Sequence, residues 1–598
     1  MALFAQLILQ IMSCQLEDAF LSKSVIMATW HSLPIEIHTI ILKLLQSHSD
    51  SGTTSNYAAV SKEWQLYFER FNFRRLILKQ SCIPEFGRVV RHHRRGMVKH
   101  VWLRVELAPY LCPACEWPER PLEILDNNQT FTAALYRLLE VFSTWKKTGQ
   151  YGVSNGGLVL ELSAYSPSDS EHYFRYPLGK DDYPHKYDET CIVDDSVKAG
   201  PPDDPPEDRT PESNTSHRTF ATPYIGHTPG ACRLFGSLLK LDYRKLDIPK
   251  ANGRLPSVSV VKALLHRRRY PRSFHPDTLL RIFDSLHGVE SIVLEPWIHD
   301  YPCHDKNFQR GFDVFLRQVG SLKRLSIYGD HQGVGTNGYN PYKIMPSLGW
   351  TLADESHLFE QLSIAFLADA KDFFHDFWPG HAPKSVDISR SGVQRALLSH
   401  LSSSRRRALG KPRKSPDFER RLAQEFKRIN GKQRIPPSIY KPTWPNLESI
   451  ALTSSLLDVA ADSKSINNLL RAAAGAALEM PKLQTMEMFS QRFMSVFVFQ
   501  YCRSLNRLPT ITISSSWPHP LESEVVGAWD RVGHKHDNTG HKIAVIRKRL
   551  KRFFFRNHGS VVYTLKLQDL ILHPVTLCQF ISEFGWEDTF AGAFWPQP

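Results

Sequence analysis

Apolar residues recur at helical spacing in two stretches close to the start of the chain. The first stretch, WHSLPIEIHTIILKLL from Trp30, has a proline in its first turn and then apolar residues on one side, namely Ile37, Ile41, Leu44 and Leu45. The second stretch places large side chains every three or four residues, at Tyr57, Val60, Trp64, Phe68 and Phe71. We expect two short amphipathic helices that share one small core, joined by a polar loop, HSDSGTTSN (48–56).

A short phrase of alternating apolar residues, typical of a strand, recurs through the rest of the chain. It occurs in VKHVWLRVEL (98–107), VESIVLEPW (289–297), LKRLSIYGD (322–330), FEQLSIAF (359–366), LESIALTSS (447–455) and LQTMEMFS (483–490). The phrases begin 33 residues apart from 289 to 322, 37 apart from 322 to 359 and 36 apart from 447 to 483, while the interval of 88 residues from 359 to 447 fits two units plus an insertion. Because one such unit cannot bury its own apolar face, this spacing predicts a stacked array of strand-plus-helix units.

The segments between the phrases have helical spacing and strong helix formers, as in FDVFLRQV (312–319) and SINNLLRAAAGAALEM (465–480). Toward the C-terminus, TITISSSW (510–517) and VVYTLKLQDLIL (561–572) predict strands. The basic stretch KIAVIRKRLKRFFF (542–555) between them predicts a helix with a solvated charged face. The fold class is therefore α/β, either as a stacked array or as an α/β domain whose phrases share only the chemistry of strands.

Composition excludes several classes of protein. The 598 residues are 42% hydrophobic and 22% charged, which excludes a wholly disordered chain, collagen and a coiled-coil rod. Nine cysteines are too sparse for a disulfide framework, which favours the cytoplasm or the nucleus. No run of about 18 apolar residues exists to span a bilayer, so we expect no membrane association. Residues 1–29 are expected to be an N-terminal extension, and Met27 is a natural first residue for the helical stretch at Trp30.

Two segments of opposite sign show the strongest local charge imbalance in a chain whose net charge is +14. Residues 181–212 carry 11 acids against three bases, and we expect 181–222 to be a disordered linker. Residues 390–441 carry 15 Lys or Arg against three acids. This basic insertion (390–442) is either a solvated loop or a patch for nuclear import or a polyanion. The body of the protein is only mildly basic, which argues against nucleic acid as a partner.

The opening helical stretch resembles the F-box. The matching features are LPxEI from Leu33, an Ile-Leu pair, Leu45, and AAVSKEW (58–64), in the order and spacing of that family. The resemblance implies a small helical bundle that docks on the Skp-type adaptor of a cullin-based (SCF) ubiquitin ligase, while the rest of the chain captures a protein substrate. Carried over residue by residue, the implied adaptor contacts are Leu33, Pro34, Ile37, Ile41, Leu45, Val60 and Trp64.

The apolar residues of the first stretch outnumber what one helix face requires. They are Leu33, Ile35, Ile37, Ile40, Ile41, Leu42, Leu44 and Leu45. We therefore expect some of this surface to stay outside the helical core and to be available to a second protein. The other possibility is that these residues only form the core of a local helical hairpin.

The recurrent phrases resemble an irregular leucine-rich-repeat array, a frequent companion of the F-box, although they lack its turn-forming asparagine or cysteine and their units exceed the usual 20–29 residues. The complete pattern resembles that of F-box proteins of filamentous fungi. The expected organisation is an F-box module (30–78), a first repeat-like part (79–180), the acidic linker, a repeat-like region (223–389), the basic insertion and a C-terminal repeat-like region (443–598).

Candidate sites for chemistry are few. Cys112 and Cys115 form a CxxC, and Cys82, His92, His93 and His100 could complete a zinc site, but two reduced thiols in a proline-bounded loop are the preferred interpretation. The glycine-rich GDHQGVGTNGYN (329–340) lacks the spacing and the lysine of a phosphate-binding loop. His375 and Asp376 adjoin without an assignable nucleophile. We therefore predict no metal, no cofactor and no enzymatic activity.

The leading hypothesis is a substrate-recognition subunit of an SCF ubiquitin ligase. Its partners would be the Skp-type adaptor, the cullin ligase and a protein substrate that the sequence does not identify. Such a protein acts by raising the effective concentration of a substrate lysine near the ligase's carrier enzyme. The alternatives are a nucleic-acid- or chromatin-associated protein that uses residues 390–441 and an enzyme whose site assembles from distant residues.

Overall fold

The structure is a computed structural model, and it divides the chain into two compact units, residues 1–72 and 73–598. It describes residues 30, 33–47, 51–145, 157–170, 229–244, 253–268, 270–297, 307–329, 346–380, 420–421, 424, 442–492, 495–504, 507–537, 542–550 and 558–577. The N-terminal extension (1–29), the acidic linker (181–222) and nearly all of the basic insertion (390–442) lie outside the described residues, as do residues 330–340 of the glycine-rich segment. None of the helices in the described part is long and apolar enough to cross a membrane.

The first unit contains helices and no strands within its described residues. It contains α2 (Ile35–Ser47), α3 (Ser51–Tyr57) and α4 (Lys62–Asn72). Its core is formed by Leu42, Trp64 and Phe68, which are buried, with partly buried aromatic and aliphatic side chains around them. The first expected amphipathic helix is thus present as α2. The second is present as α4 only from Lys62 onward, because Tyr57 ends α3 and Val60 lies in the turn between α3 and α4.

The prediction of a polar loop between these helices was wrong, because residues 51–57 form α3. Tertiary contacts explain a helix in so polar a sequence. Thr54 is buried, and the Asn72 side chain donates a hydrogen bond to the Thr54 carbonyl oxygen (3.3 Å). Tyr57, at the end of α3, places its ring 5.9 Å from that of Trp64 and 5.3 Å from that of Phe68. Packing therefore overrides the weak helix propensity of Ser, Gly and Thr.

The second unit is mixed α/β and is built on one sheet of 12 strands within the described residues. Strand order equals chain order: β1 (Arg75–Leu78), β2 (His100–Glu106), β3 (Leu158–Tyr165), β4 (Val261–His266), β5 (Ser291–Leu294), β6 (Arg324–Tyr328), β7 (Gln361–Asp369), β8 (Ser449–Thr453), β9 (Thr485–Arg492), β10 (Ser495–Ser504), β11 (Arg507–Ser515) and β12 (Ala544–Arg549). All neighbouring strands are parallel except the pairs that β10 makes with β9 and β11. Residues 75–78, expected in the helical module, are the first strand of this sheet.

Each of the six recurrent phrases contains a strand, namely β2, β5, β6, β7, β8 and β9. The expectation of two units between residues 359 and 447 was wrong, because β7 pairs directly with β8. The long interval is therefore a single connection within the sheet, and it contains the basic insertion.

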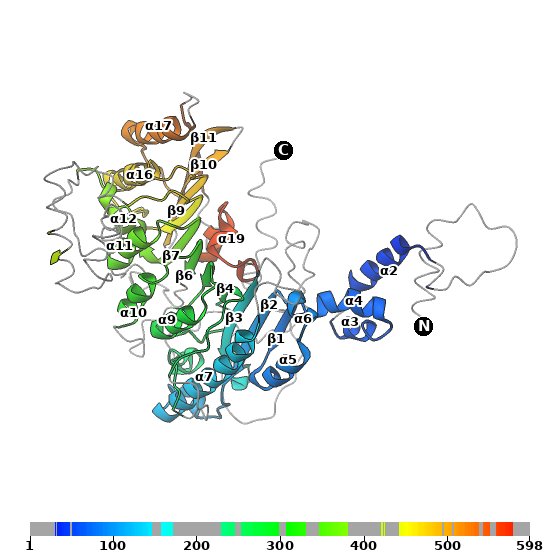
Figure 1. Ribbon diagram of the computed structural model, residues 1–598. Helices are drawn as coiled ribbons and strands as arrows, with labels where there is room; N and C mark the ends of the chain where they lie inside the picture. Colours follow the sequence, from blue (N-terminus) through cyan, green and yellow to red (C-terminus); the bar gives the residue numbers. More distant parts are fainter. Residues whose placement is uncertain are drawn as a thin grey trace, which may run out of the picture. The chain divides into compact units, whose positions relative to one another are not determined.

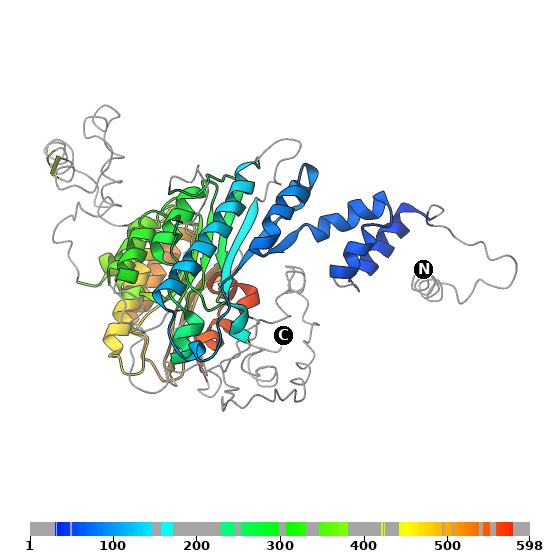
Figure 2. The ribbon, with the colours of Figure 1, turned by 90° about the horizontal axis from the view of Figure 1, so that it is seen from below.

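Helices connect successive strands and cover one face of the sheet (Figures 1 and 2). They include α7 (Pro121–Ser143), α9 (Pro276–Ser285), α10 (Asn307–Leu316), α11 (Pro346–Glu355), α12 (Ala370–Phe373), α16 (Ser463–Ala477) and α17 (Ser523–Asp537). Shorter helices are α5 (Ile83–Val89), α6 (His93–Met97) and α8 (Pro229–Phe235). Connections of this kind let each strand of a parallel sheet lie beside its predecessor.

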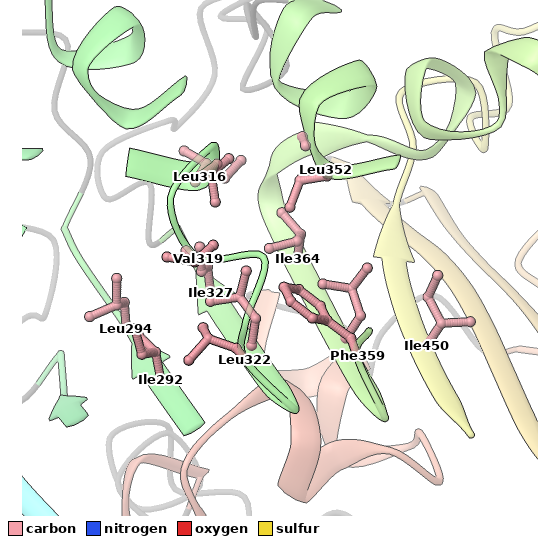
Figure 3. Packing of buried hydrophobic residues seen from close by; sticks show 14 of the residues in the cluster. Ile292, Leu294, Leu316, Val319, Leu322, Ile327, Leu352, Phe359, Ile364 and Ile450 are labelled. Carbon is pink, nitrogen blue, oxygen red and sulfur yellow. The ribbon is translucent and has the colours of Figure 1, made fainter. Parts of the chain in front are cut away.

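The main core lies between these helices and the sheet. Figure 3 shows alternate strand residues, such as Ile292, Ile327, Ile364 and Ile450, packed with Leu316 and Leu352 from the helices. Burying each such side chain contributes roughly 1.5–3 kcal/mol, so the array gains stability from every added unit.

The other face of the sheet carries the remaining strand residues. Over β6–β10 they include Tyr328, Ala365, Ala451, Phe489 and Val498, and these pack in a second core with residues of α18 (His558–Tyr563) and α19 (Gln568–Ile571). In Figure 1 the red α19 lies on the side of the sheet opposite α10 and α11. We call this side the second face.

Two C-terminal predictions were wrong. Residues 561–572, expected to be a strand, lie in α18, α19 and their connection, and residues 544–549, expected to be helical, form the edge strand β12. The apolar residues of 561–572 cover the second face of the sheet instead of joining it. Most side chains of β12 are exposed. Its sequence therefore lacks the alternation of apolar and polar residues that identifies a half-buried strand.

Candidate functional site

An apolar surface lies on α2 in the helical unit. Ile37, Ile40 and Leu44 follow one another at helical intervals of three and four residues, so they share one side of α2. Ile40 is 49% exposed, Ile37 is exposed and Leu44 is half-buried. At the start of the same helix, Ile35 is 63% exposed. We refer to Ile35, Ile37, Ile40 and Leu44 as the α2 surface.

The seven predicted adaptor contacts divide by exposure. Pro34, Ile37 and Val60 are exposed, and Leu33 and Leu45 are half-buried. Ile41 and Trp64 are buried, at 3% and 6% exposure. The Trp64 ring packs in the helical core, 5.9 Å from the Phe68 ring. Trp64 therefore stabilises the module from inside, and a direct contact with another protein would require it to move.

Ile35 and Ile40 belong to the exposed surface but were not among the predicted contacts. The signal was present in the sequence, because both residues contribute to the excess of apolar residues between Leu33 and Leu45. Helical spacing alone does not separate the core side of α2 from the neighbouring apolar side. The positions of α3 and α4 decide which side is covered.

A polar contact fixes the beginning of α2. The Glu63 carboxylate on α4 accepts a hydrogen bond from Trp30 Nε1 (2.9 Å) and lies 3.0 Å from His38 Nδ1. The rings of Trp30 and His38 stack with their centroids 4.0 Å apart. The second ring nitrogen of His38 lies 2.5 Å from the Trp30 carbonyl oxygen. These contacts tie the residue before the Leu33–Pro34 turn to both helices, so the apolar side of α2 is presented on an ordered framework.

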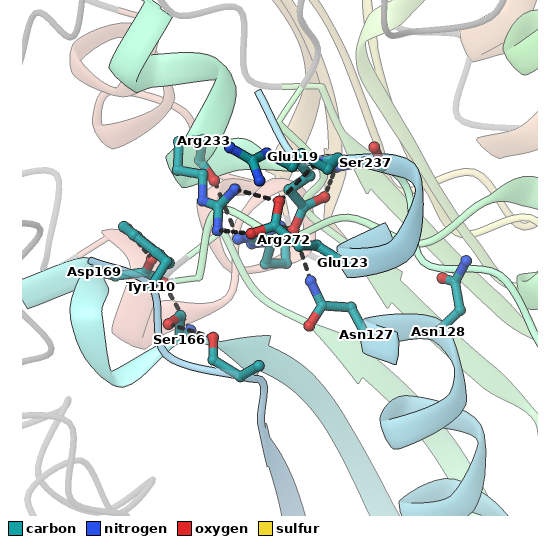
Figure 4. A network of polar contacts seen from close by, with 12 residues as sticks. Tyr110, Glu119, Glu123, Asn127, Asn128, Ser166, Asp169, Arg233, Ser237 and Arg272 are labelled. Carbon is teal, nitrogen blue, oxygen red and sulfur yellow. Dashed lines mark hydrogen bonds and ion pairs between the residues drawn. The ribbon is translucent and has the colours of Figure 1, made fainter. Parts of the chain in front are cut away.

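In the sheet unit, a buried ionic network holds the segment that follows β2 (Figure 4). Arg272 pairs with Glu119, and Arg233 contacts both carboxylate oxygens of Glu123, at 2.8 and 2.9 Å. The Tyr110 hydroxyl donates to Asp169 (2.8 Å). Burial raises the pKa of Asp169. Every carboxylate of this network has a hydrogen-bonding partner, so the arrangement is suited to holding a loop and offers no free nucleophile or base.

A second cluster lies on the second face of the sheet near its N-terminal end. Trp102 of β2, Tyr165 of β3 and Tyr270 pack together as a small buried group. The Arg104 guanidinium lies 5.1, 5.0 and 5.3 Å from the centres of the Trp102, Tyr165 and Tyr270 rings, respectively. Arg267 approaches the Trp102 ring at 4.8 Å and pairs with the buried Glu161 (2.6 Å).

The candidate zinc ligands are not brought together. Cys112 Sγ and Cys115 Sγ lie 3.3 Å apart, but no group of three or more potential ligands occurs in the described part of the chain. His100 lies on β2 with its Nε2 atom 2.9 Å from a Glu161 oxygen. Burial raises the pKa of Cys115 to about 12, which keeps this thiol protonated at neutral pH. The pair therefore has the character of reduced thiols.

The His375–Asp376 pair is formed, with His375 Nδ1 3.2 Å from an Asp376 carboxylate oxygen. The His375 ring lies 5.5 Å from that of Trp350 on α11. Neither contact supplies a nucleophile for the pair to activate.

Comparison with known proteins adds one match. Residues 319–573 match the model of a family described as a family of unknown function (DUF6546), and no F-box family is detected. None of the curated proteins matches the chain. The matched range runs from just before β6 to the end of α19. The chain is therefore similar to that family over strands β6–β12 and over the helices that cover the two faces of this part of the sheet.

Proposed function

We propose that this protein is a substrate-recognition subunit of a cullin-type ubiquitin ligase. In this proposal the helical unit is an F-box that binds the Skp-type adaptor, and the sheet unit is a divergent leucine-rich-repeat-like array that binds a protein substrate. The observation that carries the proposal is the exposure of the α2 surface within a small helical unit whose sequence resembles the F-box.

The physical argument rests on unburied apolar area. Scattered single apolar residues are normal on a protein surface, but Ile37, Ile40 and Leu44 are contiguous on one side of α2. Each large aliphatic side chain that a partner removes from water contributes roughly 1.5–3 kcal/mol. Val60, which is 61% exposed, precedes α4 and adds a further apolar side chain to this unit. A protein partner with an apolar groove fits these features.

The order of strands supports the second part of the proposal. Strand order equals chain order across the sheet, and helices connect the strands on one face, which is the arrangement of stacked repeat units. The second face is covered by α18 and α19 over β6–β10, but on β2 it carries the half-buried charged residues Arg104 and Glu106, which suit a surface that selects a partner by hydrogen bonds and charge. The nucleic-acid alternative depends on residues 390–441, which lie almost entirely outside the described residues, and no described contact favours it.

The test is co-purification of the full-length chain with a purified Skp-type adaptor. We expect Ile37→Asp combined with Ile40→Asp to weaken adaptor binding at least 100-fold, because two carboxylates would be placed in an apolar interface. The matched control is Leu66→Asp, which changes an apolar residue of α4 that is 56% exposed and lies away from the side that carries Trp64 and Phe68. Circular dichroism of each variant checks that the helices remain.

Two results would overturn the proposal. One is a wild-type chain that does not bind the adaptor at micromolar concentrations. The other is a double variant that binds as well as the Leu66→Asp control. A DNA- or RNA-binding assay over a salt series tests the alternative, since binding through phosphate contacts falls steeply as the salt concentration rises.

A further inference from the structure

Side chains of β2 alternate between the main core and the second face. Val101, Leu103 and Val105 are buried in the main core. The alternate residues, His100, Trp102, Arg104 and Glu106, therefore share the other side of the strand. On β3 their register partners are Val159, Glu161, Ser163 and Tyr165. This part of the second face is rich in charged and aromatic residues.

Both carboxylates of this group are already engaged. Glu161 is paired with Arg267 (2.6 Å) and with His100 (2.9 Å). Glu106 accepts hydrogen bonds from Lys79 Nζ (2.6 Å) and from the Tyr165 hydroxyl (3.0 Å). Lys79 pairs with Glu106 and Arg267 pairs with Glu161, so Arg104 is the third cation of this group and has no carboxylate paired with it in the described part of the chain.

The Arg104 side chain makes no ion pair within the described residues. No side-chain hydrogen bond joins it to an acid either, and its Nε atom is buried without a hydrogen-bond partner. The residue as a whole is only half-buried, so the guanidinium is not sealed inside the protein. The other buried arginines nearby differ in this respect, because Arg267 pairs with Glu161 and Arg272 pairs with Glu119. Glu106 interacts with Arg104 through its charge without forming an ion pair, so an anion that binds the guanidinium directly would compensate its partial burial more fully.

The surrounding rings hold the Arg104 guanidinium in place. Trp102, Tyr165 and Tyr270 lie on it at 5.0–5.3 Å from ring centre to Cζ, within the range of cation–π attraction. The Trp102 ring is itself fixed, because its Nε1 donates to Ser163 Oγ (2.8 Å). A guanidinium that is already ordered loses little conformational freedom on binding, and its planar donors match two oxygens of a phosphate or a carboxylate.

We propose that Arg104, with its cage of Trp102, Tyr165 and Tyr270, is a binding site for one oxyanionic group, a phosphoryl or carboxylate group carried by the protein substrate. That the group belongs to a protein substrate rests on the proposed function. That the site recognises an oxyanionic group rests on the geometry around Arg104 alone. The rings do not form a site for a cationic ligand, because Arg104 occupies the space between them.

The first test uses inorganic phosphate and acetate as probes with the full-length protein. Phenylglyoxal modifies arginine side chains, and peptide mapping by mass spectrometry follows each arginine separately. We expect phosphate, acetate or both to slow modification of Arg104 at least fivefold relative to chloride at equal ionic strength. Arg88, an exposed residue that pairs with Glu85, is the control in the same sample and should not respond.

The outcomes of this test are distinct. Protection by phosphate alone assigns a phosphoryl ligand, protection by acetate alone assigns a carboxylate, and protection by both supports a general oxyanion site. Equal rates with every anion, or equal protection of Arg104 and Arg88, would overturn the inference.

The second test compares variants with three peptides of otherwise identical neutral sequence that carry a central phosphoserine, glutamate or serine. Arg104→Gln should lower the affinity for the preferred anionic peptide at least tenfold. Arg104→Lys should restore only part of it, because a lysine keeps the charge but loses the planar donors and the stacking. Adaptor co-purification is measured on the same variants and should be unchanged. If the protein fails to bind the adaptor but anions still protect its Arg104 from modification, the proposed function is refuted and the oxyanion site is retained.

Discussion

The side chains of Arg272 and Glu119 form an ion pair that is almost completely buried, with 2% and 3% of their surfaces exposed. Glu119 also accepts hydrogen bonds from the Asn127 side chain and from the Ser237 backbone, both at 2.7 Å. Arg272 donates a further bond to the Arg233 carbonyl oxygen (3.1 Å). The pair thus joins the segment after β2 to α7, to α8 and to the segment after β4.

Removing one partner of this ion pair should destabilise the sheet unit strongly. Glu119→Ala leaves the Arg272 guanidinium buried without its counter-charge, and we expect a loss of about 3–5 kcal/mol in the free energy of unfolding of the sheet unit. Urea unfolding followed by tryptophan fluorescence measures it. The control is Glu85→Ala, which removes an exposed carboxylate paired with Arg88 and should change stability little. A Glu119→Ala variant as stable as this control would contradict the structural role given to the pair.

The buried His266 and the half-buried His573 should make the sheet unit sensitive to mild acid. Burial lowers the pKa of His266 to about 4, and burial together with Arg267 lowers that of His573 to about 3. Both values lie below the ordinary value near 6.5, so the unfolded chain takes up these protons first. The stability these residues provide is complete above pH 6.5 and falls as the pH drops toward 4. The slope should be about 1.4 kcal/mol per pH unit for each histidine.

The measurement is urea unfolding at a series of pH values from 7 to 4.5. His573→Asn should reduce the slope of the unfolding free energy against pH by the contribution of one proton, because asparagine does not titrate in this range. The amide oxygen of the asparagine can still accept the hydrogen bond that the Val575 backbone donates to His573 Nδ1. An unchanged slope in this variant would show that His573 is not kept neutral by burial. Glu161 titrates separately, because its pKa, which burial would raise, is held near 2 by Arg267 and His100.

The sequence-based predictions were accurate for elements whose burial imposes a regular apolar pattern and inaccurate for elements in which it does not. The phrases around Ile327 and Ile364 were identified as strands because one face of each packs on helices and imposes a regular apolar alternation. The α2 helix was identified for the same reason. Residues 544–549 form an exposed edge strand, and 561–572 lie over the second face of the sheet, so neither segment shows the pattern of its true structure.

The candidate site was predictable only in part. The excess of apolar residues in α2 indicated an exposed surface, but it did not indicate that the predicted adaptor contact Trp64 is buried, because tryptophan at a helical interval is equally suited to a core. The Arg104 cage could not be predicted. Trp102, Tyr165 and Tyr270 come from three separate segments, and the Tyr270 ring joins the other two, lying 5.7 Å from each of them.

The C-terminal helices should depend on one buried carboxylate. Glu487 of β9 accepts hydrogen bonds from the Lys566 and Leu567 backbone amides, both at 2.9 Å, and from Gln500 Nε2 (2.6 Å). Glu487→Gln replaces one acceptor oxygen by a donor, which leaves a backbone N–H without a partner and costs about 1–3 kcal/mol. Hydrogen exchange of residues 561–572 should accelerate roughly 5- to 150-fold for that energy. Glu360→Gln, at an exposed position, is the control, and equal exchange in both variants would contradict the prediction.

The two thiols of the CxxC should differ in reactivity. Cys112 is exposed and Cys115 is buried, and burial raises the pKa of Cys115 to about 12. At pH 8 only about one Cys115 thiol in ten thousand would be ionised, and the thiolate is the reactive form. Brief treatment with iodoacetamide followed by peptide mapping should label Cys112 and leave Cys115 unmodified. Equal labelling of both residues in folded protein would show that the loop around them opens readily.

Two helical glycines should respond in opposite directions to alanine. A Cβ atom on Gly349 of α11 would lie 2.6 Å from Asp372 Cβ and 2.9 Å from the backbone nitrogen of Phe373, so α11 and α12 could not keep their close approach. A Cβ on Gly527 of α17 meets no atom within 4 Å. Gly527→Ala should therefore stabilise the protein by about 0.5–1 kcal/mol, the usual helical preference of alanine over glycine.

Gly349→Ala gains the same helical preference but must separate two packed backbone segments, and overpacking of this kind typically costs about 1–3 kcal/mol. We expect a net loss of stability in urea unfolding, with Gly527→Ala measured in parallel as the matched change. Because both substitutions add one methyl group to a helix, a difference in sign isolates the contact between α11 and α12. Stabilisation by both substitutions would mean that this contact yields at little cost and that the two helices are less tightly joined than their geometry indicates.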